Sequence, residues 1–205
     1  MPSSNSLSRE FFARPTLQVA RELIGKRLVR LENGKRIAGY INEAEAYVGE
    51  DDQGCHARAG RTKRTAIMYG LPGFTYVYFT YGMHWLLNLV TEEEGFPAAV
   101  LIRSIWPSEG IDVIASRREG VLPARWTDGP GKITRALNID GSLNGIDVCV
   151  PGAALFLEEG ISIPDSIVTK TPRVGLNSVP EPWKSIPWRF LVPGAALQDI
   201  LVEDL

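Results

Sequence analysis

The sequence predicts an α+β fold: one compact domain with a curved, barrel-like antiparallel sheet and flanking helices. Apolar-rich segments are joined by short turns of the hairpin type, and strands do not alternate with helices as they do in βαβ units. Fourteen prolines and 20 glycines indicate many further turns. The 205 residues, 44% of them hydrophobic, suffice for one core. Since no repeat or linker divides the chain, we expect a single domain over residues 1–205.

Two short helices are expected ahead of the sheet. Residues 1–7 are polar and should form a frayed leader. Ser8 is placed to cap a first helical turn that ends at Phe12. Pro15 suits the start of a second helix, Thr16–Ile24, because proline is favoured in the first turn.

A hairpin is expected next. Asn33-Gly34 separates the apolar-rich segments Arg27–Leu31 and Arg36–Val48, and such a dipeptide is a strong hairpin signal. Alternation along the second strand predicts one face that begins apolar and ends polar, formed by Ile37, Gly39, Ile41, Glu43, Glu45 and Tyr47. The following segment, 49–73, is rich in Gly, Asp and Arg, and its length indicates a functional loop.

The rest of the chain is predicted to form short strands and two helices. The first two strands are joined by the turn Tyr81-Gly82-Met83, a second hairpin signal. The expected strands are 74–81, His84–Val90, Ala98–Ile105, Ala154–Leu157, Thr169–Val174 and Arg189–Val192, and the expected helices are Pro107–Ser116 and Gly131–Leu137.

Composition indicates a protein without a membrane span or a secretory signal, because there is no apolar run of that length and no basic start followed by an apolar stretch. Cys55 and Cys149 show no paired metal spacing, and we expect both to be reduced thiols. These observations favour a cytoplasmic location, close to the nucleoid if the chain is bacterial.

The distribution of charge permits a nucleic-acid partner that the net charge of −2 does not suggest. Residues 58–64 (RAGRTKR) carry four basic groups and no acid, whereas acids gather at 92–94 and 158–159. The basic run is either a DNA-facing surface or an ordinary solvated loop.

Three groups of residues are candidates for chemistry. Glu43, Glu45 and Tyr47 lie on one predicted strand face, with His56 nearby in the loop, and two carboxylates with a histidine suit hydrolysis. A divalent-metal site on Glu43, Glu45 and His56 is an alternative, although the spacing matches no standard metal motif. Exposed polar residues on a half-solvated strand are the other alternative.

Aromatic residues form the second group. Tyr81 stands at the tip of a turn, where a ring is badly placed for burial and well placed to wedge between bases. Tyr76 and Phe79 are expected in the core, and an RNA-stacking surface on the strand is an alternative for this run. The third group is Gly129-Pro130-Gly131-Lys132 at a predicted helix start, which suits a phosphate contact but lacks the P-loop pattern.

Taken together, these segments resemble the alkyladenine-type 3-methyladenine DNA glycosylases over almost the whole chain. The matching segments are LSREFFARPTLQVARELIGKRLVR, INEAEAYVGEDD, GCHARAGRTKRTAIMYGLPG, YVYFTYGMHWLLNLVT, VLIRSIWP, DGPGKITRAL, TPRVGL and PWRFLVPG. EAEAY, YxYxxYGMxxxxN and DGPGK in this order are specific to the family. Ala66 and Ile67 replace bulkier or more polar residues of the family's loop, which puts loop contacts to DNA in doubt.

The resemblance implies a role for individual residues. Glu45 matches the catalytic glutamate, with Arg103 and the carbonyl of Val174 beside its water. The base pocket would be formed by Tyr47, His56, Tyr78 and Asn88, the last obstructing the 2-amino group of guanine. The residues expected at the DNA are Tyr81, which would enter the vacated stack, with Met83, Arg61, Lys63, Arg64 and Lys132.

The activity implied is that of a monofunctional DNA glycosylase of base excision repair. It would flip alkylated or deaminated purines (3-methyladenine, 7-methylguanine, hypoxanthine or ethenoadenine) out of double-stranded DNA and leave an abasic site. No metal, organic cofactor or lysine nucleophile is expected, and a monomer is favoured. The rival interpretations are a catalytically silent nucleic-acid-binding module of the same fold and a metal-dependent hydrolase.

Overall fold

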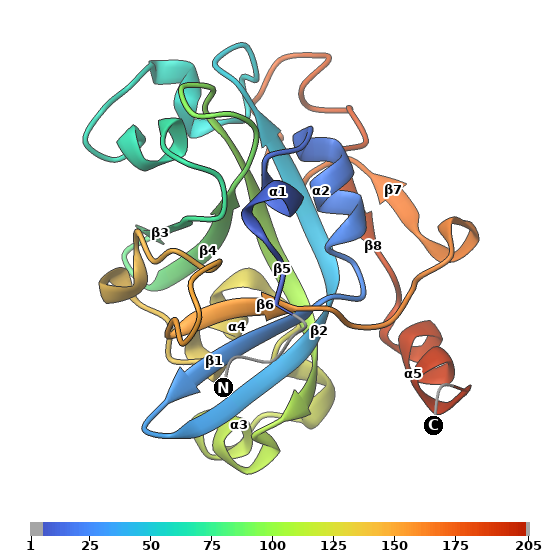
Figure 1. The fold of residues 1–205 in the computed structure, drawn as a ribbon. Helices are drawn as coiled ribbons and strands as arrows, with labels where there is room; N and C mark the ends of the chain where they lie inside the picture. Colours follow the sequence, from blue (N-terminus) through green and yellow to red (C-terminus); the bar gives the residue numbers. More distant parts are fainter. Residues whose placement is uncertain (1–5, 204–205) are drawn as a thin grey trace.

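The computed structural model describes residues 6–203 and contains the predicted α+β fold (Figure 1). Its sheet has eight strands, all paired antiparallel, in the order β3-β4-β5-β2-β1-β6, with β7 and β8 attached through β2. The strands are β1 (Arg27–Glu32), β2 (Lys35–Val48), β3 (Thr75–Thr80), β4 (His84–Val90), β5 (Ala98–Glu109), β6 (Leu155–Glu158), β7 (Thr169–Thr171) and β8 (Arg189–Leu191). The end strands β3 and β6 do not pair, so the curved sheet stays open rather than closing into a barrel.

Helices cover the sheet where its apolar side chains need burial. They are α1 (Arg9–Phe12), α2 (Thr16–Glu22), α3 (Ile111–Arg117), α4 (Pro130–Ala136) and α5 (Gly194–Glu203). Helix α2 packs on β2 and β5, and α4 packs on β4 and β5, with α5 beside the C-terminus (Figure 1). Val19, Ile133 and Leu197 bring α2, α4 and α5 into one apolar core with the sheet. None of the helices in residues 6–203 is long and apolar enough to cross a membrane.

The β1–β2 hairpin follows the prediction from Asn33-Gly34. Glu32 pairs with Lys35, and the two turn residues have positive φ angles of 50° and 76°. A turn of this kind requires positive φ at both central residues, which asparagine and glycine tolerate best. The strands therefore match the predicted segments to within a residue or so.

The prediction that Ile41 and Glu43 lie on the same face of β2 is wrong. Ile37 and Ile41 belong to the main core together with Ala44 and Ala46, whereas Glu43 and Glu45 do not. The pairing with β5 shifts register on both sides of Glu43, and a β-bulge of this kind changes which side chains face the core. Simple alternation fails because the bulge changes its phase, so that the carboxylates leave the core face.

The predicted helix 107–116 begins too early. Strand β5 continues to Glu109, and α3 begins only at Ile111. Pro107 pairs with Gly39 of β2, and a Cβ at Gly39 would lie 2.7 Å from the carbonyl oxygen of Trp106. The absence of a side chain at Gly39 thus lets the strands approach and keeps this proline in the sheet.

Other boundaries differ at the chain ends. The leader is ordered from residue 6, since Ser6 bridges Glu158 and the buried Leu7 donates its N–H to Leu157; residues 1–5 of the expected leader lie outside the described residues. Ser8 occupies the N-cap position of α1, but its side chain forms no capping hydrogen bond. Helix α2 ends two residues early, β7 stops before Pro172, and α5 was not predicted.

Candidate active site

A cavity of about 500 Å³ opens beside β3, β4 and β5, and it collects most of the predicted site residues. Cavities of this size are typical of small-molecule sites. The predicted residues that line it are Tyr47, His56, Tyr78, Tyr81, Asn88, Arg103, Lys132 and Val174. Glu45 does not line it, because its side chain is 0% exposed and lies behind this lining.

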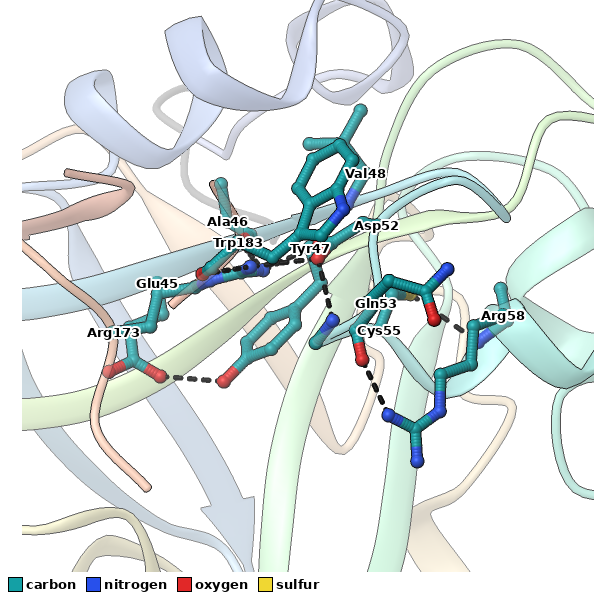
Figure 2. A network of polar contacts seen from close by, with 12 residues as sticks. Glu45, Ala46, Tyr47, Val48, Asp52, Gln53, Cys55, Arg58, Arg173 and Trp183 are labelled. Carbon is teal, nitrogen blue, oxygen red and sulfur yellow. Dashed lines mark hydrogen bonds and ion pairs between the residues drawn. The ribbon is translucent and has the colours of Figure 1, made fainter. Parts of the chain in front are cut away.

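Three donors hold the buried carboxylate of Glu45. Tyr47 donates its hydroxyl to Oε2 at 2.8 Å (Figure 2), and the backbone N–H of Val174 donates to Oε1 at 2.7 Å. Nε of Arg103 lies 3.3 Å from Oε1. An ionised carboxylate offers about four acceptor positions, so these donors leave one for a water molecule. Neither the tyrosine hydroxyl nor the N–H was anticipated from the sequence, which assigned Tyr47 to stacking alone and Val174 through its carbonyl.

Burial raises the pKa of Glu45, while Arg103, the N–H of Val174 and the hydroxyl of Tyr47 act in the opposite direction. The net result is a carboxylate that is more basic than an exposed glutamate. A general base works best when its pKa approaches the pH at which it operates. The environment of Glu45 therefore suits proton abstraction from water.

Glu43 has a place in the site that the sequence left open. Its Oε1 accepts from Nε of Arg103 at 2.7 Å and lies 2.9 Å from Nε of Arg189. Arg103 thus lies between two carboxylates and is closer to Glu43 than to Glu45. Glu43 holds Arg103 at the cavity and limits how tightly it pairs with Glu45.

An aromatic wall faces the cavity from the loop and β3. The His56 and Tyr78 rings meet edge to face with centroids 4.7 Å apart, and Nδ1 of His56 lies 2.9 Å from the hydroxyl of Tyr76. Tyr76 is buried as predicted for a core residue, but this contact also makes it part of the site. The core assignment of Phe79 is wrong, since 47% of that residue is exposed.

His56 is uncharged at neutral pH. Burial, followed by the charges of Arg64 and Arg58, lowers the pKa of its imidazole to about 4. A neutral ring beside the cavity accepts a stacked base without repelling a positive charge on it.

Arg173 is the functional residue that the sequence analysis missed. It forms a fully buried ion pair with Asp52, with contacts of 2.5 and 2.8 Å, and donates to the carbonyl oxygen of Ala46 at 3.0 Å (Figure 2). Its guanidinium carbon lies 4.7 Å from the ring centroid of Tyr47. The two partners are 121 residues apart in the chain, so no local pattern pointed to them. The ion pair holds Arg173 in place and thereby positions the next residue, Val174, whose N–H contacts Glu45.

Asn88 pairs with Tyr76 across β3 and β4 and is 4% exposed. Its Nδ2 donates to the carbonyl oxygen of Tyr76 at 3.0 Å. The side chain therefore pairs with a backbone carbonyl group, which is the structural alternative to a role in base selection. It nevertheless lines the cavity. One asparagine can serve both purposes, because the hydrogen bond fixes the side chain at the cavity wall.

The β3–β4 turn presents apolar side chains to solvent. Tyr81 is 84% exposed and Met83 is 67% exposed. Tyr81 has a φ of 51° and the following Gly82 one of 65°, which gives a tight turn whose first residue projects from the tip. The wedge role expected of Tyr81 requires an exposed ring and stays a prediction.

The predicted basic contacts separate into two kinds. Arg61, Lys63 and Arg64 are all exposed in the loop, but Arg64 also contacts the aromatic wall. Lys132 lies at the cavity but pairs with Asp128 at 2.6 Å, which offsets part of its charge.

Glu43, Glu45 and His56 do not converge as metal ligands. In the part of the chain that the structure describes, no three His, Cys, Asp or Glu side chains form a group that could hold a metal ion. Cys55 and Cys149 are free thiols, and burial raises the pKa of Cys55 to about 12. The buried thiol is therefore a poor nucleophile.

Residues 10–196 match the family model described as methylpurine-DNA glycosylase. Relatives whose names propose 3-methyladenine DNA glycosylase activity include proteins of Methanocella arvoryzae (46% identity, 90% of each chain), Desulfitobacterium hafniense (46%, 90% of this chain and 93% of the relative) and Herpetosiphon aurantiacus (44%, 92% and 86%). Fold, site and relatives together define a DNA-repair enzyme that hydrolyses N-glycosyl bonds. The chain belongs to the methylpurine-DNA glycosylase family.

Proposed function

We propose that this enzyme excises alkylated or deaminated purines from double-stranded DNA, with Glu45 activating the water that attacks the sugar. The observation that carries the proposal is the carboxylate of Glu45, buried and basic, held by Tyr47 and Val174 behind the lining of an aromatic cavity. The substrate class includes 3-methyladenine, 7-methylguanine, hypoxanthine and ethenoadenine.

The cavity accepts a base only after the nucleotide has left the stack, which costs a few kcal/mol. Damaged base pairs are already weakened, so flipping their nucleotides costs less free energy. The exposed Tyr81 fills the vacated position and slows return of the base. The base stacks between Tyr47 and the wall of His56 and Tyr78, with Asn88 at its edge.

Hydrolysis proceeds through an oxocarbenium-like state of the sugar, as glycoside cleavage does. The C1′–N bond breaks and its electron pair leaves with the base. A cationic purine therefore departs as a neutral molecule, whereas a neutral purine such as hypoxanthine takes up a proton from solvent as it leaves. Glu45 takes a proton from water as the water oxygen bonds to C1′, and its charge stabilises the sugar. With no lysine acting as a Schiff-base nucleophile, the product is an abasic site in an unbroken strand.

Access to Glu45 requires local movement. Val174 is exposed on a loop outside the strands and helices, and its N–H covers Oε1. A small shift of this loop opens the carboxylate to the cavity, and water then occupies its remaining acceptor position.

The experiment is incubation with duplexes that carry hypoxanthine, ethenoadenine or a methylated purine, followed by alkali to cut abasic sites. We expect cutting at the damaged position in the presence of EDTA, and a loss of about 10²–10⁴-fold in rate for Glu45→Gln with damaged-duplex binding retained. Loss of activity in EDTA would favour the metal hydrolase. Binding without any excision by the wild type would favour the silent module. We also propose a monomer, which light scattering tests.

A further inference from the structure

Arg64 contacts three residues of the aromatic wall. Its Nη2 lies 3.3 Å from Nε2 of His56, and its Nε donates to the hydroxyl of Tyr76 at 3.3 Å. Its guanidinium carbon lies 4.8 Å from the centroid of the Tyr78 ring. Three side chains of one wall therefore meet a single arginine. Arg64 itself does not line the cavity and is exposed to solvent, so it contacts the wall from outside the cavity.

The contact with His56 fixes the tautomer of the imidazole. A guanidinium has only donors, so Nε2 of His56 must accept from Arg64. In the neutral ring the proton is then on Nδ1, which donates to the hydroxyl of Tyr76. With Arg64 in place, His56 presents a neutral ring of fixed orientation to the cavity.

The charge of Arg64 is not offset by a carboxylate. Arg103 and Arg173 both pair with acids, whereas Arg64 forms no ion pair with any residue in the range 6–203. The guanidinium carbon of Arg64 lies 4.8 Å from the ring centroid of Tyr78, and a base stacked on that ring lies about 3.5 Å from it. A positive charge on the base would then stand within about 8 Å of the guanidinium, close enough for a repulsion that solvent screens in part.

We propose that Arg64 is a positioning and specificity residue of the base cavity: it fixes His56 as the neutral Nδ1–H tautomer and shifts selection from purines of fixed positive charge toward neutral purines. This inference rests on the proposed function. It differs from the contact with a phosphate expected of Arg64 as one member of a basic loop. A phosphate contact would act alike on every damaged base, whereas a charge beside Tyr78 distinguishes cationic from neutral bases.

The test compares single-turnover release of 3-methyladenine, a fixed cation in DNA, with release of hypoxanthine, which is neutral, at pH 7.5. We expect Arg64→Met to raise the ratio of 3-methyladenine to hypoxanthine release about 3- to 10-fold, a range reduced by the solvent exposure of Arg64. Arg64→Lys keeps the charge, so its ratio should stay near that of the wild type.

Arg61→Met is the matched control. Arg61 lies in the same loop and contacts Tyr69 rather than the wall. Its loss removes the same charge from the DNA-facing loop, so it should slow both reactions by one factor and leave the ratio unchanged. A ratio for Arg64→Met within twofold of that for Arg61→Met would overturn the assignment of selectivity to Arg64.

The tautomer is measured without substrate. The chain has two histidines, so the ¹⁵N signals of His56 are identified by comparison with His56→Gln. We expect a protonated Nδ1 and an unprotonated Nε2 in the wild type, and a mixture of tautomers in both Arg64→Met and Arg64→Lys. An Nε2–H tautomer in the wild type would contradict the inference. Failure of the wild type to release any base would instead contradict the proposed function and leave this measurement valid.

Discussion

Replacing Asp52 by Asn should destabilise the fold strongly, because Asp52 neutralises the fully buried Arg173. Asp52 also accepts from the backbone N–H groups of Val48 and Gly54, at 3.1 and 2.9 Å. An asparagine keeps the shape and loses the charge. Leaving a buried charge without its partner costs about 3–5 kcal/mol.

For a chain of this length, each kcal/mol lowers the midpoint of thermal unfolding by about 2–4 °C, so the expected decrease is on the order of 10 °C. Circular dichroism during heating and urea titration measure it. Asp52→Leu combined with Arg173→Met removes both charges and should recover most of the loss, since a buried pair is often replaceable by apolar groups. If Asp52→Asn costs less than about 1 kcal/mol, Arg173 is not a charge that depends on this partner.

Four further predictions concern the site. Burial raises the pKa of Glu45 above its unfolded value, so folding takes up a proton here and the wild type loses stability as pH rises through the folded pKa. Glu45→Gln should therefore be the more stable protein at pH 8, with the gap closing below about pH 4.5; urea midpoints across pH check this, and a gap that is constant with pH would contradict it. Glu43→Gln should free Arg103 to pair more closely with Glu45, which lowers turnover about 10-fold and moves the acidic limb of the pH–rate profile down while KM stays constant; an unmoved limb would make Glu43 purely structural. Asn88→Ser should raise excision of normal guanine relative to hypoxanthine about 5- to 150-fold, assayed in one duplex context, and an unchanged ratio would leave Asn88 with only its bond to Tyr76. Duplex binding should weaken with salt with a log–log slope of roughly −4, and a flat response would show that the basic loop does not face DNA.

Local signals predicted most of the fold. Asn33-Gly34 gave the first hairpin, and the pattern on both sides of Tyr81-Gly82 gave the second to within a residue. Pro107 misled the assignment, because a proline is commonly a break and here Gly39 opposite makes room for it in the sheet. The errors thus come from cross-strand geometry that no single segment contains.

In the site, too, features defined by local sequence were predicted and those formed by distant residues were not. The motif containing Glu45 and Tyr47 was visible, and so was the exposed Tyr81, because each is defined within a few residues. The ion pair Asp52–Arg173 could not be predicted, because two charged residues 121 positions apart form no local sequence pattern. The contacts of Arg64 with the wall were also hidden, since sequence alone does not distinguish a basic residue that faces only phosphate from one that also contacts the site.

Because of the bulge in β2, the position of Glu45 depends on the number of residues between Ile41 and Glu45. Between Ile41, which faces the core, and Glu45, which faces the site, the register shift sets the phase of the whole second half of the strand. Deleting Ala44 would leave the net charge unchanged, yet it would shift Glu45 into the core-facing position of Ala44 and Ala46 into the position of Glu45. A single-codon deletion here should therefore abolish excision. The bulge thus determines which side chains in the second half of β2 face the site and which face the core.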